Sequence, residues 1–469
     1  MSSEGKRNGN MNEMTATKDA LRQLFACAIG FFATFAVAYI MKIGNTVVPL
    51  VDIFSILCVM LGGYKLANGE HTGCDKSVVY FVCWTGISCV LTLLYCMRGD
   101  FDNYALTVPL RGYLVLLCGI TMYIAVSSVW SERRWLFIGL TAGILLNLAC
   151  SLISLWAFNK GTYFNLYSIF PQDYYQVPMK YENWALNPGA QKITEYRPQG
   201  LFLECSHLML FLICMLPLVF FESRSTLVRA LLCFFGAFAT ITSKSPNAVF
   251  FMLELIVLWA VFRRKGCPEQ QIRKRVRLGG GVWLLIIACL VGLFAYLLVK
   301  PETVNNVVSQ LSIAFSDLNV ADSKDGGTTE RWNNMQLAFS LLSEYPLGTG
   351  WNMETYVMEH NFVGNVASSH TIILKYLVEI GPLGLGLYVY LIYRHSIPLL
   401  KRNTTSFQKI LGIAVLFLFI SQATNGLSLA PWMWLLLGMA HAEITHAAAG
   451  EAALQARCVK PEVRYAWQV

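Results

Sequence analysis

Residues 77–97 read SVVYFVCWTGISCVLTLLYCM, a run that contains no charged residue. A helix needs roughly 20 apolar residues to cross a hydrocarbon core about 30 Å thick, so this run predicts a transmembrane helix. The whole chain agrees, because 55% of its 469 residues are hydrophobic and only 14% are charged. Soluble domains carry about 25% charged residues. The composition therefore excludes an ordinary soluble protein.

Runs of the same kind recur along most of the chain and predict an all-α integral membrane protein with about 12 transmembrane helices. They form one membrane domain, 23–446, between an amino-terminal tail, 1–22, and a carboxyl-terminal tail, 447–469. The predicted spans are 23–41, 47–64, 77–97, 109–129, 135–157, 201–222, 226–242, 246–262, 279–299, 371–393, 407–426 and 431–446.

Basic residues predict the orientation of these spans. The net charge of +8 could indicate a nucleic-acid partner, but the Lys and Arg residues cluster in short connections between apolar runs. Such clusters mark the cytoplasmic side of a membrane protein. With the amino end in the cytoplasm, the strongly basic connections fall on that side, and an even number of spans returns the carboxyl end there. We therefore expect an inner-membrane protein with both termini cytoplasmic and no nucleic-acid partner. The residues include Lys65, Lys76, Arg133, Arg134, Arg224, Arg229, Arg263, Arg264, Lys265, Arg394, Lys401 and Arg402.

Two long polar segments, 158–200 and 300–370, then face away from the cytoplasm as large periplasmic loops. The first is rich in aromatic residues, whereas the second has three basic and eight acidic residues, a net charge of −5. Within the second loop, the apolar spacing predicts a helix over 330–344 that lies in the outer interface, and Pro346 and Gly348 end it. Its apolar side is expected to hold Trp332, Met335, Phe339 and Leu342.

Cysteine positions give no sign of a metal site or a disulfide framework. None of the 14 cysteines lies in either long loop, and most lie inside apolar runs. No Cys/His cluster has the spacing of a zinc site, and neither loop has an Asp-x-Asp pair. We therefore expect no metal and no other cofactor.

A few ionisable residues stand on the predicted outer side. Arg197 lies in YRPQGLFLECSH, and Glu204 lies seven residues later, just inside the sixth span. Lys244 lies in the turn ITSKSPNAVF, Arg331 in TTERWNN, and His370 in SSHTIILKYLVEIGPLGLGL. Each also has a structural reading: arginines extend to lipid headgroups, a lysine is common in turns, and Glu204 can pair with Arg197. Asp52 and Glu254 are further carboxylates inside predicted spans, where they either make helix contacts or have a role.

Together these side chains suit a polyprenyl diphosphate substrate. Guanidinium groups bind phosphate oxygens in pairs and stay charged. When a glycan leaves such a lipid, the diphosphate is the leaving group, and nearby cations stabilise the charge that develops on it. A histidine or a carboxylate can take the proton from an acceptor hydroxyl. The pattern therefore indicates glycosyl transfer at the membrane surface.

Between residues 197 and 386 the sequence resembles the O-antigen ligase and polymerase superfamily of membrane glycosyltransferases. The resemblance rests on EYPLGTGWN at 344–352, on SSHTIILKYLVEIGPLGLG at 368–386, on RPQGLFLECSH from Arg197 and on the turn ITSKSPNAV. It implies a GT-C-like fold and an inverting, metal-independent transfer. By this resemblance the lipid diphosphate is held by Arg197, Lys244 and Arg331, and the catalytic residues are His370, Glu204 and Arg197.

Two departures from the family pattern concern these residues. Lys244 stands where the family usually has arginine, which removes paired phosphate binding at that position. Cys205 replaces the usual small residue or proline after Glu204.

Three classes of function follow. The segment RPQGLFLE favours a polymerase that joins undecaprenyl-diphosphate-linked oligosaccharide repeat units into O-antigen or exopolysaccharide, with membrane lipid and a chain-length regulator protein as further partners. A ligase would share the donor but transfer the polymer to lipid A core. A polysaccharide-lipid transporter would instead have a polar central cavity and small outer loops, and the two long loops disfavour it.

Overall fold

The structure of the protein is a computed structural model. It describes the ranges 19–35, 39–43, 46–49, 54–56, 58–59, 73–160, 200–202, 205–243, 247–263, 326–361, 371–401, 404–423 and 430–458. The predicted ninth span, 279–299, and most of the two predicted outer loops lie outside the described residues.

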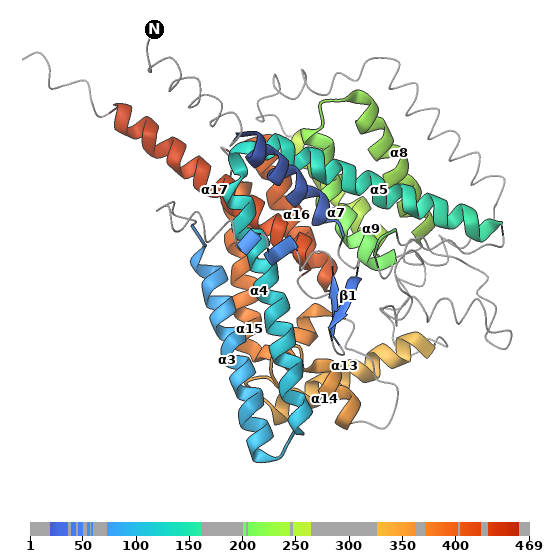
Figure 1. Ribbon diagram of the computed structural model, residues 1–469, viewed down its shortest axis with the longest axis vertical. Helices are drawn as coiled ribbons and strands as arrows, with labels where there is room; N and C mark the ends of the chain where they lie inside the picture. Colours follow the sequence, from blue (N-terminus) through green and yellow to red (C-terminus); the bar gives the residue numbers. More distant parts are fainter. Residues whose placement is uncertain are drawn as a thin grey trace, which may run out of the picture.

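The described chain is helical apart from one small hairpin (Figure 1). Five helical segments are long and apolar enough to cross a membrane: Lys76–Arg98, Thr107–Ser128, Trp130–Ala157, Cys205–Glu222 and Ile372–Leu400. The α-helices are α3 (Lys76–Arg98), α4 (Thr107–Ser128), α5 (Arg133–Asn159), α7 (Cys205–Glu222), α8 (Thr226–Ser243), α9 (Asn247–Arg263), α13 (Gly326–Glu344), α14 (Glu354–Asn361), α15 (Ile372–Ser396), α16 (Ser406–Gln422) and α17 (Pro431–Cys458).

Nine of the predicted spans coincide with helices of the structure, namely α3, α4, α5, α7, α8, α9, α15, α16 and α17. The all-helical class is therefore confirmed. The count of about 12 crossings stays a prediction, because α8, α9 and α16 contain shorter apolar segments than the five above. The last helix, α17, continues to Cys458, past the predicted end of the twelfth span at 446.

The first two predicted spans, 23–41 and 47–64, differ from the structure where they approach each other. Residues 19–32 are helical, but an antiparallel hairpin follows, formed by β1 (Tyr39–Ile43) and β2 (Thr46–Pro49). Ile43 pairs with Thr46, and the sequence between them is Gly-Asn, a favoured pair for a two-residue hairpin loop. Thr46, Val47 and Val48 are β-branched and favour a strand. Hydropathy alone could not separate these short apolar strands from helix.

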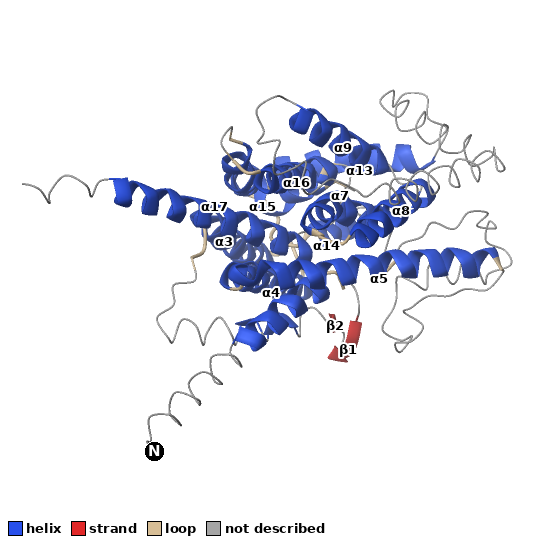
Figure 2. Cartoon of the chain, turned by 90° about the horizontal axis from the view of Figure 1, so that it is seen from above, coloured by secondary structure: helices blue, strands red, loops and turns tan. Residues whose placement is uncertain are grey.

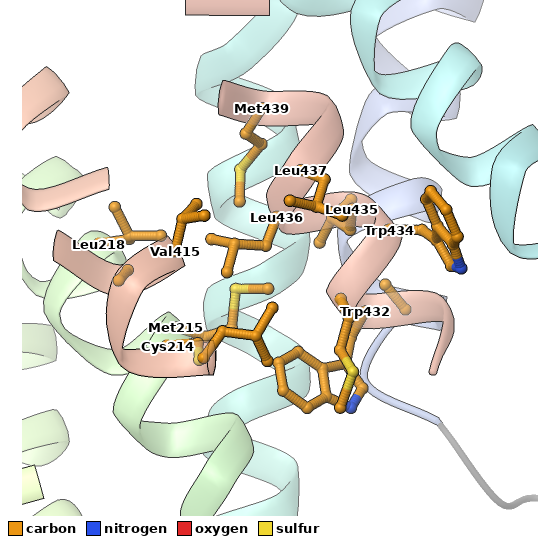
Figure 3. Packing of buried hydrophobic residues seen from close by; sticks show 14 of the residues in the cluster. Cys214, Met215, Leu218, Val415, Trp432, Trp434, Leu435, Leu436, Leu437 and Met439 are labelled. Atoms are coloured by element: carbon orange, nitrogen blue, oxygen red, sulfur yellow. The ribbon is translucent and has the colours of Figure 1, made fainter. Parts of the chain in front are cut away.

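One hydrophobic core joins helices that are far apart in sequence. Figure 1 shows α3, α4 and α15 running side by side, with α5 and α8 to one side, and Figure 2 shows the same bundle from above. The amino-terminal half of α17 lies within the bundle, where Trp432 and Trp434 are fully buried. Figure 3 shows their neighbours Cys214 and Met215 of α7 and Val415 of α16. The last helix is therefore part of the core.

Polar contacts tie several helices together at one end of the bundle. Asp75 caps α3, where its carboxylate accepts hydrogen bonds from the Ser77 amide at 2.8 Å and the Ser77 hydroxyl at 2.6 Å. The same carboxylate pairs with Arg394 Nη2 of α15 at 3.2 Å. His441 Nε2 of α17 lies 2.9 Å from the Gly73 carbonyl oxygen. This end therefore gathers the start of α3, the carboxyl end of α15 and the middle of α17.

Further contacts at the same end agree with the prediction that the basic residues gather on one side of the membrane. Arg133 Nη1, at the start of α5, is 2.8 Å from Glu443 Oε1 of α17. The Tyr123 hydroxyl of α4 lies 3.0 Å from His395 Nε2, the residue after Arg394. The basic residues Arg133 and Arg394 are thus at one end of the bundle, as the positive-inside pattern requires.

We predict that Asp75→Asn destabilises the protein at neutral pH. Burial alone would raise the pKa of Asp75, but hydrogen bonds from Ser77, the charge of His395 and a hydrogen bond from Arg394 outweigh it and lower the pKa from 3.8 to about 2. The ionised carboxylate therefore stabilises the fold above pH 3.8, and this contribution is lost as the pH falls towards 2. Asparagine keeps the helix cap, so the loss at pH 7 should be about 1–2 kcal/mol.

The measurement is the melting temperature of the purified protein in detergent between pH 8 and pH 3. The difference from wild type should shrink in acid. Asp100→Asn is the control, because its partner Arg98 is 69% exposed and such pairs contribute little. An equal deficit at every pH would contradict the electrostatic explanation.

Candidate active site

Helix α15 is interrupted at Gly381–Pro382. Gly381 adopts φ 67° and ψ −179°, which is not helical, and Pro382 has no amide hydrogen for the carbonyl one turn earlier. Three carbonyl groups before the break are bonded from elsewhere in the chain. Val378 O accepts from the Thr349 amide at 2.8 Å, Glu379 O from the Gly350 amide at 2.8 Å, and Ile380 O from the Trp84 indole at 2.8 Å.

The segment that supplies two of these donors is the PLGTGWN motif, 346–352. Gly348 has φ 96°, and a Cβ there would lie 2.5 Å from Glu379 O, so only glycine allows the close approach. The hydroxyl of Thr92, from α3, donates to Thr349 O at 3.1 Å. We call residues 345–354 together with 378–381 the loop–kink junction. The predicted helix end at Pro346 and Gly348 is confirmed, because α13 ends at Glu344.

Helix α13 packs on this junction through its small and aliphatic residues. Ala338 and Leu341 are buried, but Phe339 is 54% exposed. The buried side faces Phe101 and the α15 residue Leu374, in a second hydrophobic cluster that includes Tyr345. Phe339, expected to face the membrane surface, is exposed on the side of α13 that does not pack on protein, and its contact with lipid stays a prediction. Placement of this helix in the outer interface stays a prediction.

The junction contains two buried carboxyl groups that the sequence reasoning missed. Glu379 is 1% exposed and Glu354 is fully buried. Glu379 Oε1 lies 3.8 Å from Lys375 Nζ and accepts a hydrogen bond from the Glu354 amide at 3.4 Å. Glu379 Oε2 has no hydrogen-bond partner among the described residues. The signal was available, because an ionisable residue inside an apolar span indicates a functional site.

Glu254, by contrast, lies away from the junction in α9. It is fully buried, and neither of its carboxylate oxygens has a hydrogen-bond partner among the described residues. It interacts electrostatically with the thiol of Cys214 in α7. It therefore sits at a contact between helices, one of the two roles expected for it.

Four of the five predicted site residues, Arg197, Glu204, Lys244 and His370, lie outside the described residues. Arg331 lies in α13, the helix that leads into the junction. His370 directly precedes Thr371 in the sequence.

Thr371 caps α15, and its hydroxyl accepts from the Leu374 amide at 3.2 Å. Since α13 packs on α15, the fold brings the helix that holds Arg331 against the helix that His370 precedes.

The neighbours of the other predicted residues also come together. Asn247, the first residue of α9, donates from Nδ2 to the Ser206 carbonyl oxygen at 3.0 Å. In the sequence, Ser206 follows Glu204 by two residues and Asn247 follows Lys244 by three. The described residues therefore bring the flank of Glu204 next to the flank of Lys244.

The fold defines a multi-pass helical membrane protein. Residues 228–389 match the family model described as O-antigen ligase. This match over part of the chain confirms the resemblance to the O-antigen polymerase and ligase family of membrane proteins found in the sequence. No curated protein and no solved structure matches the chain.

The family match bears on the activity and on some of the predicted site residues. It implies a glycosyl-transferring enzyme with a lipid-linked glycan substrate. The matched segment begins in α8, ends in α15, and includes Lys244, Arg331 and His370. Arg197 and Glu204 precede it. The segment that favours a polymerase over a ligase therefore lies outside the matched residues.

We predict that Gly381→Ala lowers the free energy of unfolding by about 2–4 kcal/mol, because an L-residue at positive φ is strained and overpacking adds to the cost. A Cβ at this position would lie 2.7 Å from the Leu347 carbonyl carbon. Gly386→Ala is the control in the same helix, because no atom lies within 4 Å of a Cβ there. Thermal unfolding in detergent should separate the two variants, and equal melting temperatures would contradict the loop–kink contact.

Proposed function

We propose that the protein polymerises undecaprenyl-diphosphate-linked oligosaccharide repeat units into a surface polysaccharide, O-antigen or exopolysaccharide, on the periplasmic face of the inner membrane. The family match carries this proposal, because it implies glycosyl transfer from a lipid-linked glycan. The segment RPQGLFLE, outside that match, supports the choice of polymerisation.

In the proposed reaction, a growing glycan moves from one undecaprenyl diphosphate to the non-reducing sugar of a second lipid-linked repeat unit. The bond between the anomeric carbon and the diphosphate oxygen breaks, and the diphosphate leaves with the bonding electrons. The acceptor hydroxyl oxygen bonds to the anomeric carbon from the opposite face, which inverts its configuration. No metal takes part.

Each predicted residue has a place in this scheme. Arg197, Lys244 and Arg331 hold the diphosphate and stabilise its developing charge. His370 takes the proton of the acceptor hydroxyl or orients that acceptor. Glu204 supplies the polymerase-type carboxylate beside the acceptor. The packing of α13 on α15, and the contact between Asn247 and Ser206, support a common site because they bring the flanks of these residues together in pairs.

A ligase is the second candidate, favoured by the description of the matched family, O-antigen ligase. It would use the same donor but transfer the polymer to lipid A core. The implied glycosyl-transferring activity disfavours the transporter alternative. For the polymerase we further propose cytoplasmic termini and a chain-length regulator protein as a partner.

The test is a gel of lipid-linked and lipid A-linked glycans from a deletion strain, rescued with wild type, Arg197→Ala or His370→Ala. Loss of a polymerase should leave lipid A core capped with a single repeat and no ladder. Both variants should fail to restore the ladder, with activity lowered at least about a hundredfold, because each removes charge stabilisation or proton transfer.

Two controls accompany these variants. Arg98→Ala removes an exposed arginine that is paired with Asp100, and His446→Ala removes an exposed histidine of α17. Both should restore the ladder. Bare lipid A core with long polymer on undecaprenyl diphosphate would instead identify a ligase. An unchanged ladder in the deletion strain would contradict an O-antigen role, and capsule and secreted polysaccharide would then be measured.

A further inference from the structure

Glu379 is attached to the PLGTGWN loop in two ways. Its main-chain carbonyl accepts from the Gly350 amide at 2.8 Å, and its side-chain Oε1 accepts from the Glu354 amide at 3.4 Å. Glu379 therefore accepts hydrogen bonds from both ends of the segment 350–354. Because α14 begins at Glu354, the same contact also fixes where that helix starts.

Burial of the Glu379 carboxylate costs free energy that an apolar side chain would not. A buried ion pair contributes little net stability, since apolar side chains of similar size would hold two segments together without the loss of hydration. Here the counter-ion, Lys375 Nζ, is 3.8 Å away, and Oε2 has no hydrogen-bond partner among the described residues. A buried polar atom in this state requires an explanation, and a functional role is one.

The charges around Glu379 come from three elements. Glu354 of α14 and Lys375 of α15 are within electrostatic range, and the thiol of Cys89 faces the same carboxylate from α3. With both carboxylates and the ammonium ionised, the buried set has one negative charge without a counter-charge. Such a set can take up a proton as the pH falls, so it can respond to pH.

We propose that Glu379 is a positioning residue for glycosyl transfer, which uses Lys375 as its counter-ion to fix residues 349–354 against α15. Through this contact it sets the relation between α13, which holds Arg331, and the start of α15, which follows His370 in the sequence. The proposal rests on the function proposed above, and it applies equally to transfer onto a repeat unit or onto lipid A core.

The variants are Glu379→Gln, which keeps the shape but removes the charge, and Glu379→Asp, which keeps the charge but shortens the side chain. Glu254→Gln is the matched control, because Glu254 is an equally buried carboxylate of a membrane helix away from the junction. Each full-length variant is expressed in the deletion strain, and membranes of the uncomplemented strain supply the accumulated lipid-linked glycan. The rate of polymer formation is measured against glycan concentration from pH 6 to pH 9, with protein amount and melting temperature determined in parallel.

We expect Glu379→Gln to lower kcat at least about tenfold with little change in KM, since misplacement of reacting groups slows the chemical step. Its rate should no longer fall towards pH 6, because the carboxylate that takes up a proton is absent. Glu379→Asp should regain part of the rate and the decline towards acid pH. Glu254→Gln should behave as wild type.

Several outcomes would overturn the proposal. Wild-type rates and pH dependence in Glu379→Gln would refute the positioning role alone, while the proposed function stands. A lower melting temperature together with an unchanged pH profile would reduce Glu379 to a structural residue. If wild-type membranes transfer no glycan to either acceptor, the proposed function fails, and the role of Glu379 fails with it.

Discussion

Helix α15 cannot continue as a regular helix through Pro382, and the carbonyl groups freed by this break need donors inside an apolar bundle. The donors come from Thr349 and Gly350 of the PLGTGWN loop and from Trp84 of α3. This exchange explains why the loop enters the bundle and why α13 and α14 are held against α15 (Figure 1). These hydrogen bonds therefore hold the PLGTGWN motif against the second motif, in α15.

Hydropathy predicted the helices well wherever an apolar run was long and bounded by charges or turn residues, as in α3, α4 and α5. It failed at the hairpin of Tyr39–Pro49, because a short run of β-branched residues has the same hydropathy as a helix. On α13 it marked Phe339 as apolar, but it gave no sign that the smaller Ala338 packs on protein while Phe339 stays exposed. Hydropathy records the affinity of a residue for apolar surroundings and does not record whether lipid or protein provides them.

The candidate site shows a similar division. The motifs around Lys244, Arg331 and His370 could be recognised in the sequence, and the family match covers all three. Their relation in space could not be recognised, because it depends on contacts between distant segments, such as Asn247 with Ser206 and Thr92 with Thr349. Glu379 was not among the predicted site residues, because those were chosen mainly as cations outside the membrane, whereas Glu379 is a buried acidic residue within a span.

The bonds from Trp84 and Thr92 to the junction have a consequence for how the protein is built and how it can vary. Both donors belong to α3, which the ribosome completes long before the residues they bond, and both lie outside the matched segment 228–389. That segment is therefore no autonomous module: it closes only onto a helix that is already in the membrane. A chimera that exchanges 228–389 between relatives would have to bring a compatible α3 with it, so the early helices constrain the evolution of a site to which they contribute no predicted residue.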